Sequence, residues 1–208
     1  MTTKKDVFED LRKAPYPMFV PSRPYSFDLN ETMIDMLRKE FGAQGVVASF
    51  AKAIGGKPLR EVEKIGKEFF EDYGQRWIKR TVQLSDEYPD RTIEMVLETV
   101  DRSGKQFMIW PHLPQRYIEV AYLSTQQFLK LPIITNSAAE LSYRVPQCLL
   151  FNTIKEKCGA EVANLMTCKA ACLKALDSID KSMELDTIIS MNAATAKDGF
   201  CEFSMKKL

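Results

Sequence analysis

Histidine is almost absent from this chain, which has a single one, His112, among 208 residues. A metal site built mainly from imidazole ligands is therefore excluded within one chain. The sequence also lacks a glycine-rich phosphate loop, a GxSxG elbow, an HExxH motif and a CxxC pair. These absences remove the common signatures of nucleotide binding, serine hydrolysis, zinc proteolysis and dithiol redox chemistry.

Neither sign of charge is in excess, because 29 basic side chains face 28 acidic ones. We therefore expect no nucleic-acid partner and no attraction to an anionic membrane. No segment approaches the roughly 20 consecutive apolar residues that a membrane-spanning helix needs. The charged N-terminal segment lacks the apolar core of a secretory signal. These features predict a cytoplasmic protein whose cysteines stay reduced.

The length of 208 residues predicts a single domain, 1–208, since two domains would each have a thin core. Prolines at four of the eleven positions 14–24 predict an extended arm over about residues 1–28. Helices are predicted at about 31–41 and 46–54, and an aromatic helix around Trp77 follows from apolar residues at three- and four-residue spacing. The arm and the aromatic helix are also candidate surfaces for a homodimer.

Two later segments change to the two-residue period of β-strands. A first hairpin is predicted at about 91–110 and a second at about 187–206, where Lys197–Gly199 forms the turn. Helices are predicted between them, at about 115–129, 146–158 and 161–176. The fold class is therefore α+β, a small antiparallel sheet of two hairpins packed against a helical layer.

The five cysteines gather late in the chain. On a helix over 161–176, Cys168 and Cys172 lie one turn apart beside the apolar stripe. On the last strand, alternation places Cys201 on the face toward the helices. Two interpretations stay open: the cysteines fill packing gaps as small apolar residues, or their sulfurs line one pocket. Zinc or iron is the candidate cofactor, with these candidate ligands: Cys148, Cys168, Cys172 and Cys201.

Three further side chains are candidates for chemistry. Cys148 follows a proline at a helix start, where the helix dipole favours a thiolate. Lys169 falls near the middle of the apolar face, so its stem either packs while the ammonium reaches the edge, or the ammonium is partly buried beside a thiol. His112 is either a surface or capping residue or a general base at the end of a strand.

Three segments resemble the L-2-amino-thiazoline-4-carboxylic acid hydrolase family. They are 145–151 (VPQCLLF), 157–168 (KCGAEVANLMTC) and 196–203 (AKDGFCEF). The resemblance implies an enzyme that opens a small cyclic carboxylate by hydrolysis of a C–N bond. It places Cys148, Cys168 and Cys201 at the catalytic positions. Lys169 is a further candidate catalytic residue, as the group that stabilises the developing negative charge. Arg144 and His112 are the candidate substrate-binding residues, and the attacking group is either a thiolate or a metal-activated water.

The C-terminal hairpin also resembles the 4-vinyl reductase-like small-ligand-binding domain. The residues that carry this second resemblance are Gly199, Cys201 and Phe203. It implies a module that binds or senses a small molecule without turnover.

Overall fold

The computed structural model describes residues 30–88 and 112–208. The predicted proline-rich arm and the predicted hairpin at 91–110 lie outside the described residues. His112 is described only as the first residue of a helix, without its side chain.

Three helices form the N-terminal half of the described chain: α2 (Glu31–Phe41), α3 (Ala43–Ile54) and α4 (Leu59–Glu87). The side chain of Asn30 caps α2, because its oxygen accepts a hydrogen bond from Met33 N–H at 3.2 Å. The apolar faces of all three helices are buried. The helices predicted here from apolar spacing are confirmed.

Four helices of different lengths come next: α6 (His112–Thr125), α7 (Leu149–Cys158), α8 (Ala160–Asn164) and α9 (Lys169–Ser182). The single helix predicted over 161–176 is wrong. The chain turns between α8 and α9, where Met166 has φ of 54°, a left-handed conformation that a continuous right-handed helix does not contain. Cys168 therefore precedes the first residue of α9 instead of lying within a helix.

The sheet has four antiparallel strands in the order β1-β2-β4-β3. Its strands are β1 (Ile133–Asn136), β2 (Glu140–Val145), β3 (Thr187–Ala193) and β4 (Cys201–Lys207). The predicted α+β class and the C-terminal hairpin are confirmed. The predicted turn at Lys197–Gly199 is a short helix, α10 (Thr195–Asp198), which ends at Gly199 with φ of 79°. The hairpin at 133–145 was not predicted.

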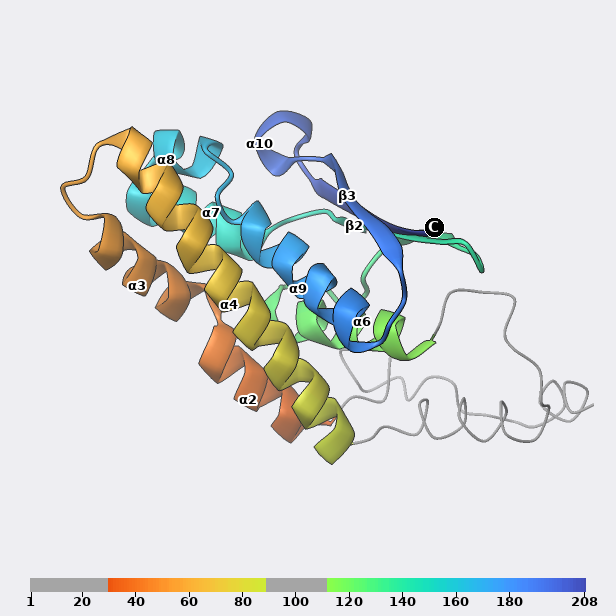
Figure 1. The fold of residues 1–208 in the computed structure, drawn as a ribbon. Coiled ribbons are helices and arrows are strands. Elements are labelled where there is room, and N and C mark those ends of the chain that lie inside the picture. Colours follow the sequence, from red (N-terminus) through yellow and green to blue (C-terminus); the bar gives the residue numbers. More distant parts are fainter. Residues whose placement is uncertain (1–29, 89–111) are drawn as a thin grey trace, which may run out of the picture.

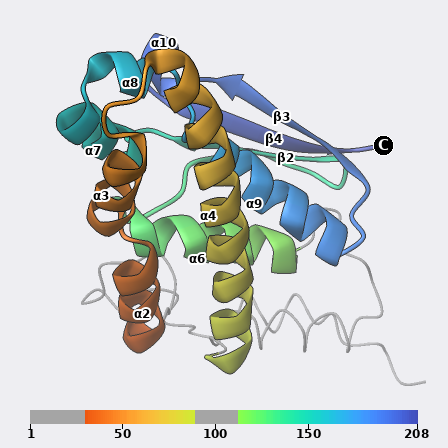
Figure 2. The same ribbon diagram turned by 60° about the vertical axis from the view of Figure 1, so that its left-hand side comes forward.

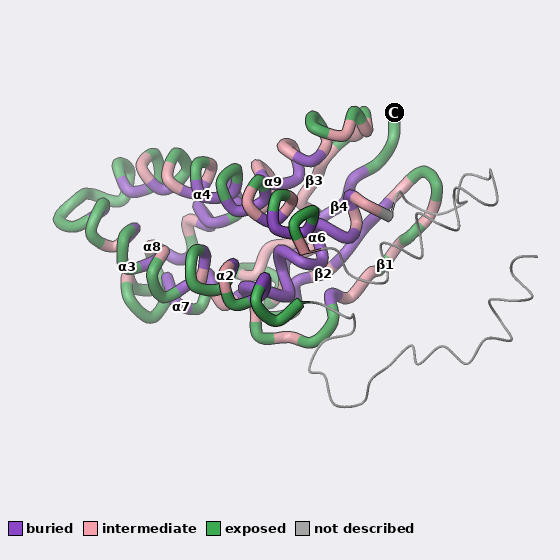
Figure 3. Tube along the Cα trace, turned by 90° about the horizontal axis from the view of Figure 1, so that it is seen from below, coloured by how far each residue is buried: buried purple, intermediate pink, exposed green. Residues whose placement is uncertain are grey.

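The helices cover one face of the sheet. Figures 1 and 2 show α9 beside α4 and next to β3, with the strands on the side of α9 away from α4. Buried segments line the space between helices and sheet, while the outer turns of the helices are exposed (Figure 3). As predicted, Cys201, Phe203 and Met205 of β4 are all buried, and Ser204 between the last two is buried as well.

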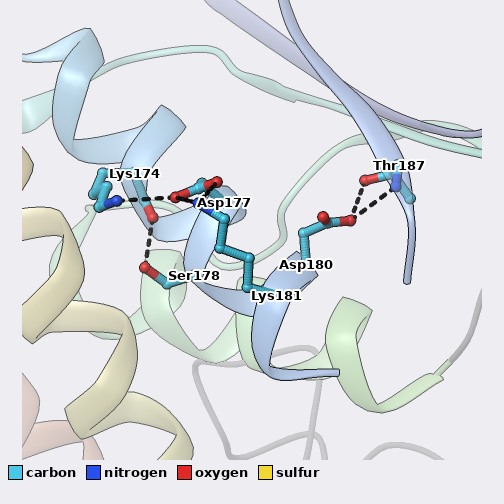
Figure 4. Close-up of polar contacts among 6 residues, drawn as sticks. All are labelled: Lys174, Asp177, Ser178, Asp180, Lys181 and Thr187. Atoms are coloured by element: carbon cyan, nitrogen blue, oxygen red, sulfur yellow. Dashed lines mark hydrogen bonds and ion pairs between the residues drawn. The ribbon is translucent and has the colours of Figure 1, made fainter. Parts of the chain in front are cut away.

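Two acidic residues in the last turns of α9 form hydrogen bonds and ion pairs with neighbouring side chains (Figure 4). Asp180 accepts hydrogen bonds from the N–H and the hydroxyl of Thr187, the first residue of β3. Asp177 pairs with Lys174 at 2.9 Å and with Lys181 at 2.7 Å. Asp180 thus sets where β3 begins relative to α9.

Within residues 30–88 and 112–208, no helix combines the length and apolar character that crossing a membrane requires.

Candidate functional site

The helical layer and the sheet partly enclose a small cavity of about 20 Å³. Every layer contributes to its wall: Tyr73 and Trp77 from α4, Tyr122 and Gln126 from α6 and the residue after it, Val145 from β2, Cys148 and Leu150 from the start of α7, Ala171 and Cys172 from α9, and Cys201 and Phe203 from β4. No acidic or basic side chain is present among these described lining residues. The wall is therefore mainly apolar with a few hydroxyl, amide and thiol groups.

Aromatic rings form a continuous chain, and all of them except Tyr143 line this cavity. Tyr73 stacks on Trp77 with ring centroids 5.9 Å apart, and Trp77 meets Tyr122 edge to face at 5.3 Å. Tyr122 then packs on Tyr143 at 5.4 Å, and Tyr143 packs on Phe203 at 5.7 Å. These offset and edge-on contacts hold each ring in place. The rings link α4 to β4 across the molecule.

Trp77, one of the residues of the wall, carries a buried polar group without a partner, its indole N–H. It is buried, and no acceptor for it exists among the residues that the structure describes. Its neighbours differ in this respect, because the Tyr73 hydroxyl donates to the Phe41 carbonyl at 3.0 Å and the Tyr143 hydroxyl donates to Tyr122 at 3.3 Å. A buried donor without a partner costs about 1–3 kcal/mol. Such a group is a position where a bound molecule can gain a hydrogen bond.

Three of the predicted site cysteines, Cys148, Cys172 and Cys201, line this one cavity. Cys168 is buried behind them and is close enough that their charges would raise its pKa further, after the larger effect of burial. All five cysteines are free thiols. Cys158 stands apart at the end of α7, half-buried. The tertiary structure therefore gathers four sulfurs that the sequence separates.

Burial favours the protonated thiol at Cys148, Cys168 and Cys172. It raises the pKa of Cys148 to about 12, although the Sγ atom accepts a hydrogen bond from Phe151 N–H at 3.4 Å. Burial also raises the pKa of Cys168 and of Cys172 well above the usual range. The expectation that the start of a helix favours a thiolate at Cys148 is wrong, because loss of hydration outweighs the hydrogen bonds from the helix terminus.

The gathered sulfurs do not fit a zinc or iron site. Over residues 30–88 and 112–208, no three histidine, cysteine or carboxylate side chains are grouped so that they could hold one ion. Metal-bound cysteines are thiolates, whereas burial favours thiols here. The described chain thus offers no geometry for the predicted metal.

Lys169 and Arg144 are not part of the cavity wall. Lys169 is the first residue of α9 and is exposed, so its predicted place on a buried apolar face is wrong. Arg144 lies in β2 between the buried residues Tyr143 and Val145 and is itself only half-buried. Its guanidinium donates to Glu202 at 2.9 Å and lies 4.0 Å from the ring centre of Phe200. The structure therefore places both cations away from the sulfurs.

Sequence reasoning missed several residues of the wall. The sequence identifies Trp77 only as part of an aromatic helix, because apolar spacing along a helix does not distinguish a cavity wall from a filled core. Tyr122 and Gln126 carried no motif. A tryptophan at the centre of an aromatic stripe, which brings an N–H that needs an acceptor, was the available signal.

Comparisons with known proteins identify no relative by sequence. No family model matches the chain, and no curated protein matches it. Two solved structures are similar at 14% identity and a TM-score of 0.29. One is a mutant H-NOX from T. Tengcongensis, where the match covers 84% of this chain and 93% of that one. The other is a Cs H-NOX mutant with 4-cyano-L-phenylalanine, where it covers 84% of this chain and 92% of that one. Similarity this low does not establish a common fold.

Proposed function

We propose that this protein is a binding module for a small, uncharged and mostly apolar molecule, held in the cavity beside Trp77. The buried indole N–H of Trp77, which has no acceptor among the described residues, carries the proposal. A ligand that offers one oxygen or nitrogen acceptor would satisfy this donor. The apolar remainder of the ligand would contact the surrounding rings.

The lining also argues for a neutral ligand. An ion in this cavity would leave water without meeting an opposite charge, since the lining residues are apolar or neutral. The cavity of about 20 Å³ has room for one water-sized molecule. A larger ligand therefore requires neighbouring side chains to move.

The indole proton of Trp77 reports directly on this proposal. Two indole signals are expected from the two tryptophans in the sequence, and Trp110→Phe assigns them. Titration with tetrahydrofuran should shift the Trp77 signal. Cyclopentane, a ring of the same size without an acceptor, should shift it less, and acetate should not shift it. The proposal would be overturned if neither tetrahydrofuran nor acetonitrile, a smaller molecule with an acceptor, shifted the Trp77 signal. It would also be overturned if acetate shifted the signal as much as tetrahydrofuran does.

A second proposal is the ring-opening hydrolase that the family resemblance implies. It is supported by the presence of Cys148, Cys172 and Cys201 around one cavity. The raised pKa of Cys148 and of Cys172 and a lining without cations favour binding over hydrolysis of a carboxylate. Incubation with 2-amino-thiazoline-4-carboxylate separates the two. Turnover that is lost in Cys148→Ser and Cys201→Ser but kept in Cys158→Ser would support hydrolysis. Absence of turnover in the unaltered protein would exclude the hydrolase proposal.

A further inference from the structure

A second, larger pocket adjoins the cavity wall. It has a volume of about 260 Å³ and opens at the surface between the end of α6 and the start of α7. Its lining residues are Gln127, Phe128, Pro146, Gln147, Leu149 and Asn152. This outer pocket uses the same two chain segments as the cavity.

Successive residues of these segments point to opposite sides. Gln126 lines the cavity and Gln127 lines the outer pocket. Cys148 and Leu150 line the cavity, whereas Leu149 between them lines the outer pocket. The two segments together therefore form the partition between the two spaces.

One hydrogen bond joins the segments across this partition. The Oε1 atom of Gln126 accepts from the backbone N–H of Leu149 at 2.8 Å. Leu149 is the first residue of α7, so its N–H has no partner inside the helix and can lose this bond without breaking a helical one. Gln126 lies just beyond α6 and is only half-buried, which leaves its side chain room to turn.

We propose that Gln126 is a latch on the entrance of the cavity. When its side chain leaves Leu149, the outer pocket and the cavity join, and a ligand passes from one to the other. This inference rests on the proposed function for the identity of the site. It also explains how a cavity with room for a water-sized molecule admits something larger.

Access to the cavity cysteines tests the latch. Methyl methanethiosulfonate, a small neutral reagent, modifies thiols that it can reach, and mass spectrometry of peptides follows each cysteine separately. Gln126→Met keeps the side-chain length but removes the strong acceptor. We expect it to speed modification of Cys148 and Cys201, the two buried cysteines of the cavity wall, at least fivefold. Gln126→Glu keeps an acceptor and should retain the slow rate, as should the matched control Gln127→Met.

Cys168 distinguishes opening of the entrance from loosening of the whole fold. It is buried but is not one of the residues that line the cavity. If Gln126→Met speeds modification of Cys168 as much as that of Cys148, or leaves both rates unchanged, the latch is overturned. The two proposals fail separately. If tetrahydrofuran does not shift the Trp77 indole signal, the proposed binding function is wrong. The rates of thiol modification test the latch separately.

Discussion

A Cβ atom at Gly74 would lie 2.1 Å from the carbonyl oxygen of Ala171. Helices α4 and α9 therefore touch backbone to backbone at this point. The next residue of α9, Cys172, and a residue one turn along α4, Trp77, consequently meet at the same cavity. The candidate site depends on this close approach.

Gly74→Ala should be strongly destabilising. The added methyl group meets backbone atoms, which cannot move aside as a flexible side chain does, so α9 must shift. We expect the free energy of unfolding to fall by about 1–3 kcal/mol or more, measured by urea denaturation. Gly45→Ala in α3 is the matched control, since nothing lies within 4 Å of the new methyl group. It should stabilise the protein by roughly 0.5–1 kcal/mol. Equal effects of the two changes would contradict the proposed role of Gly74.

The stability of the protein should fall in alkaline solution through Cys148. Its pKa rises from an ordinary value of 9.0 to about 12 on folding. The contribution is therefore complete below pH 9 and is lost as the pH rises toward 12, because the unfolded chain releases the proton first. Cys148→Ser keeps an oxygen acceptor for Phe151 N–H and removes the thiol titration. Between about pH 8.5 and 11 its free energy of unfolding should decline less steeply than that of the unaltered protein. Parallel curves would show that Cys148 titrates normally.

Asp180→Ala should loosen the start of β3. It removes the acceptor of two hydrogen bonds from Thr187, and the expected loss is about 1–3 kcal/mol. Asp177→Ala, on the same helix, removes ion pairs with Lys174 and Lys181 that are partly exposed and should cost at most about 1 kcal/mol. Hydrogen exchange at the Thr187 amide should accelerate in the first variant alone. A larger effect at Asp177 would reverse this ranking.

Arg144→Gln should leave the cavity unchanged. Arg144 pairs with Glu202 and covers Phe200 instead of lining the cavity. The partly exposed pair is expected to contribute about 1 kcal/mol to stability. The Trp77 indole signal and its response to tetrahydrofuran should stay as in the unaltered protein. A lost response with intact stability would place Arg144 in the binding site after all.

The parts of the fold that were predicted correctly are those with a strong local pattern. The cap at Asn30, the long aromatic helix and the inward direction of Cys201 follow from neighbours in the sequence. The hairpin at 133–145 escaped prediction because β1 has only four residues, too few to show a period. The turn at Met166 escaped because an apolar residue gives no sign of a left-handed conformation.

The sequence by itself determined most of the helical segments, the apolar face of each, and that all five cysteines would lie late in the chain. Only the tertiary structure decided that Cys148, Cys172 and Cys201 share one cavity, that Lys169 and Arg144 lie apart from it, and that the Trp77 N–H is left without an acceptor among the described residues. The physical reason is the range of the interactions. Period and capping depend on residues a few positions apart, whereas the cavity depends on how closely distant elements approach, as Gly74 and Ala171 do.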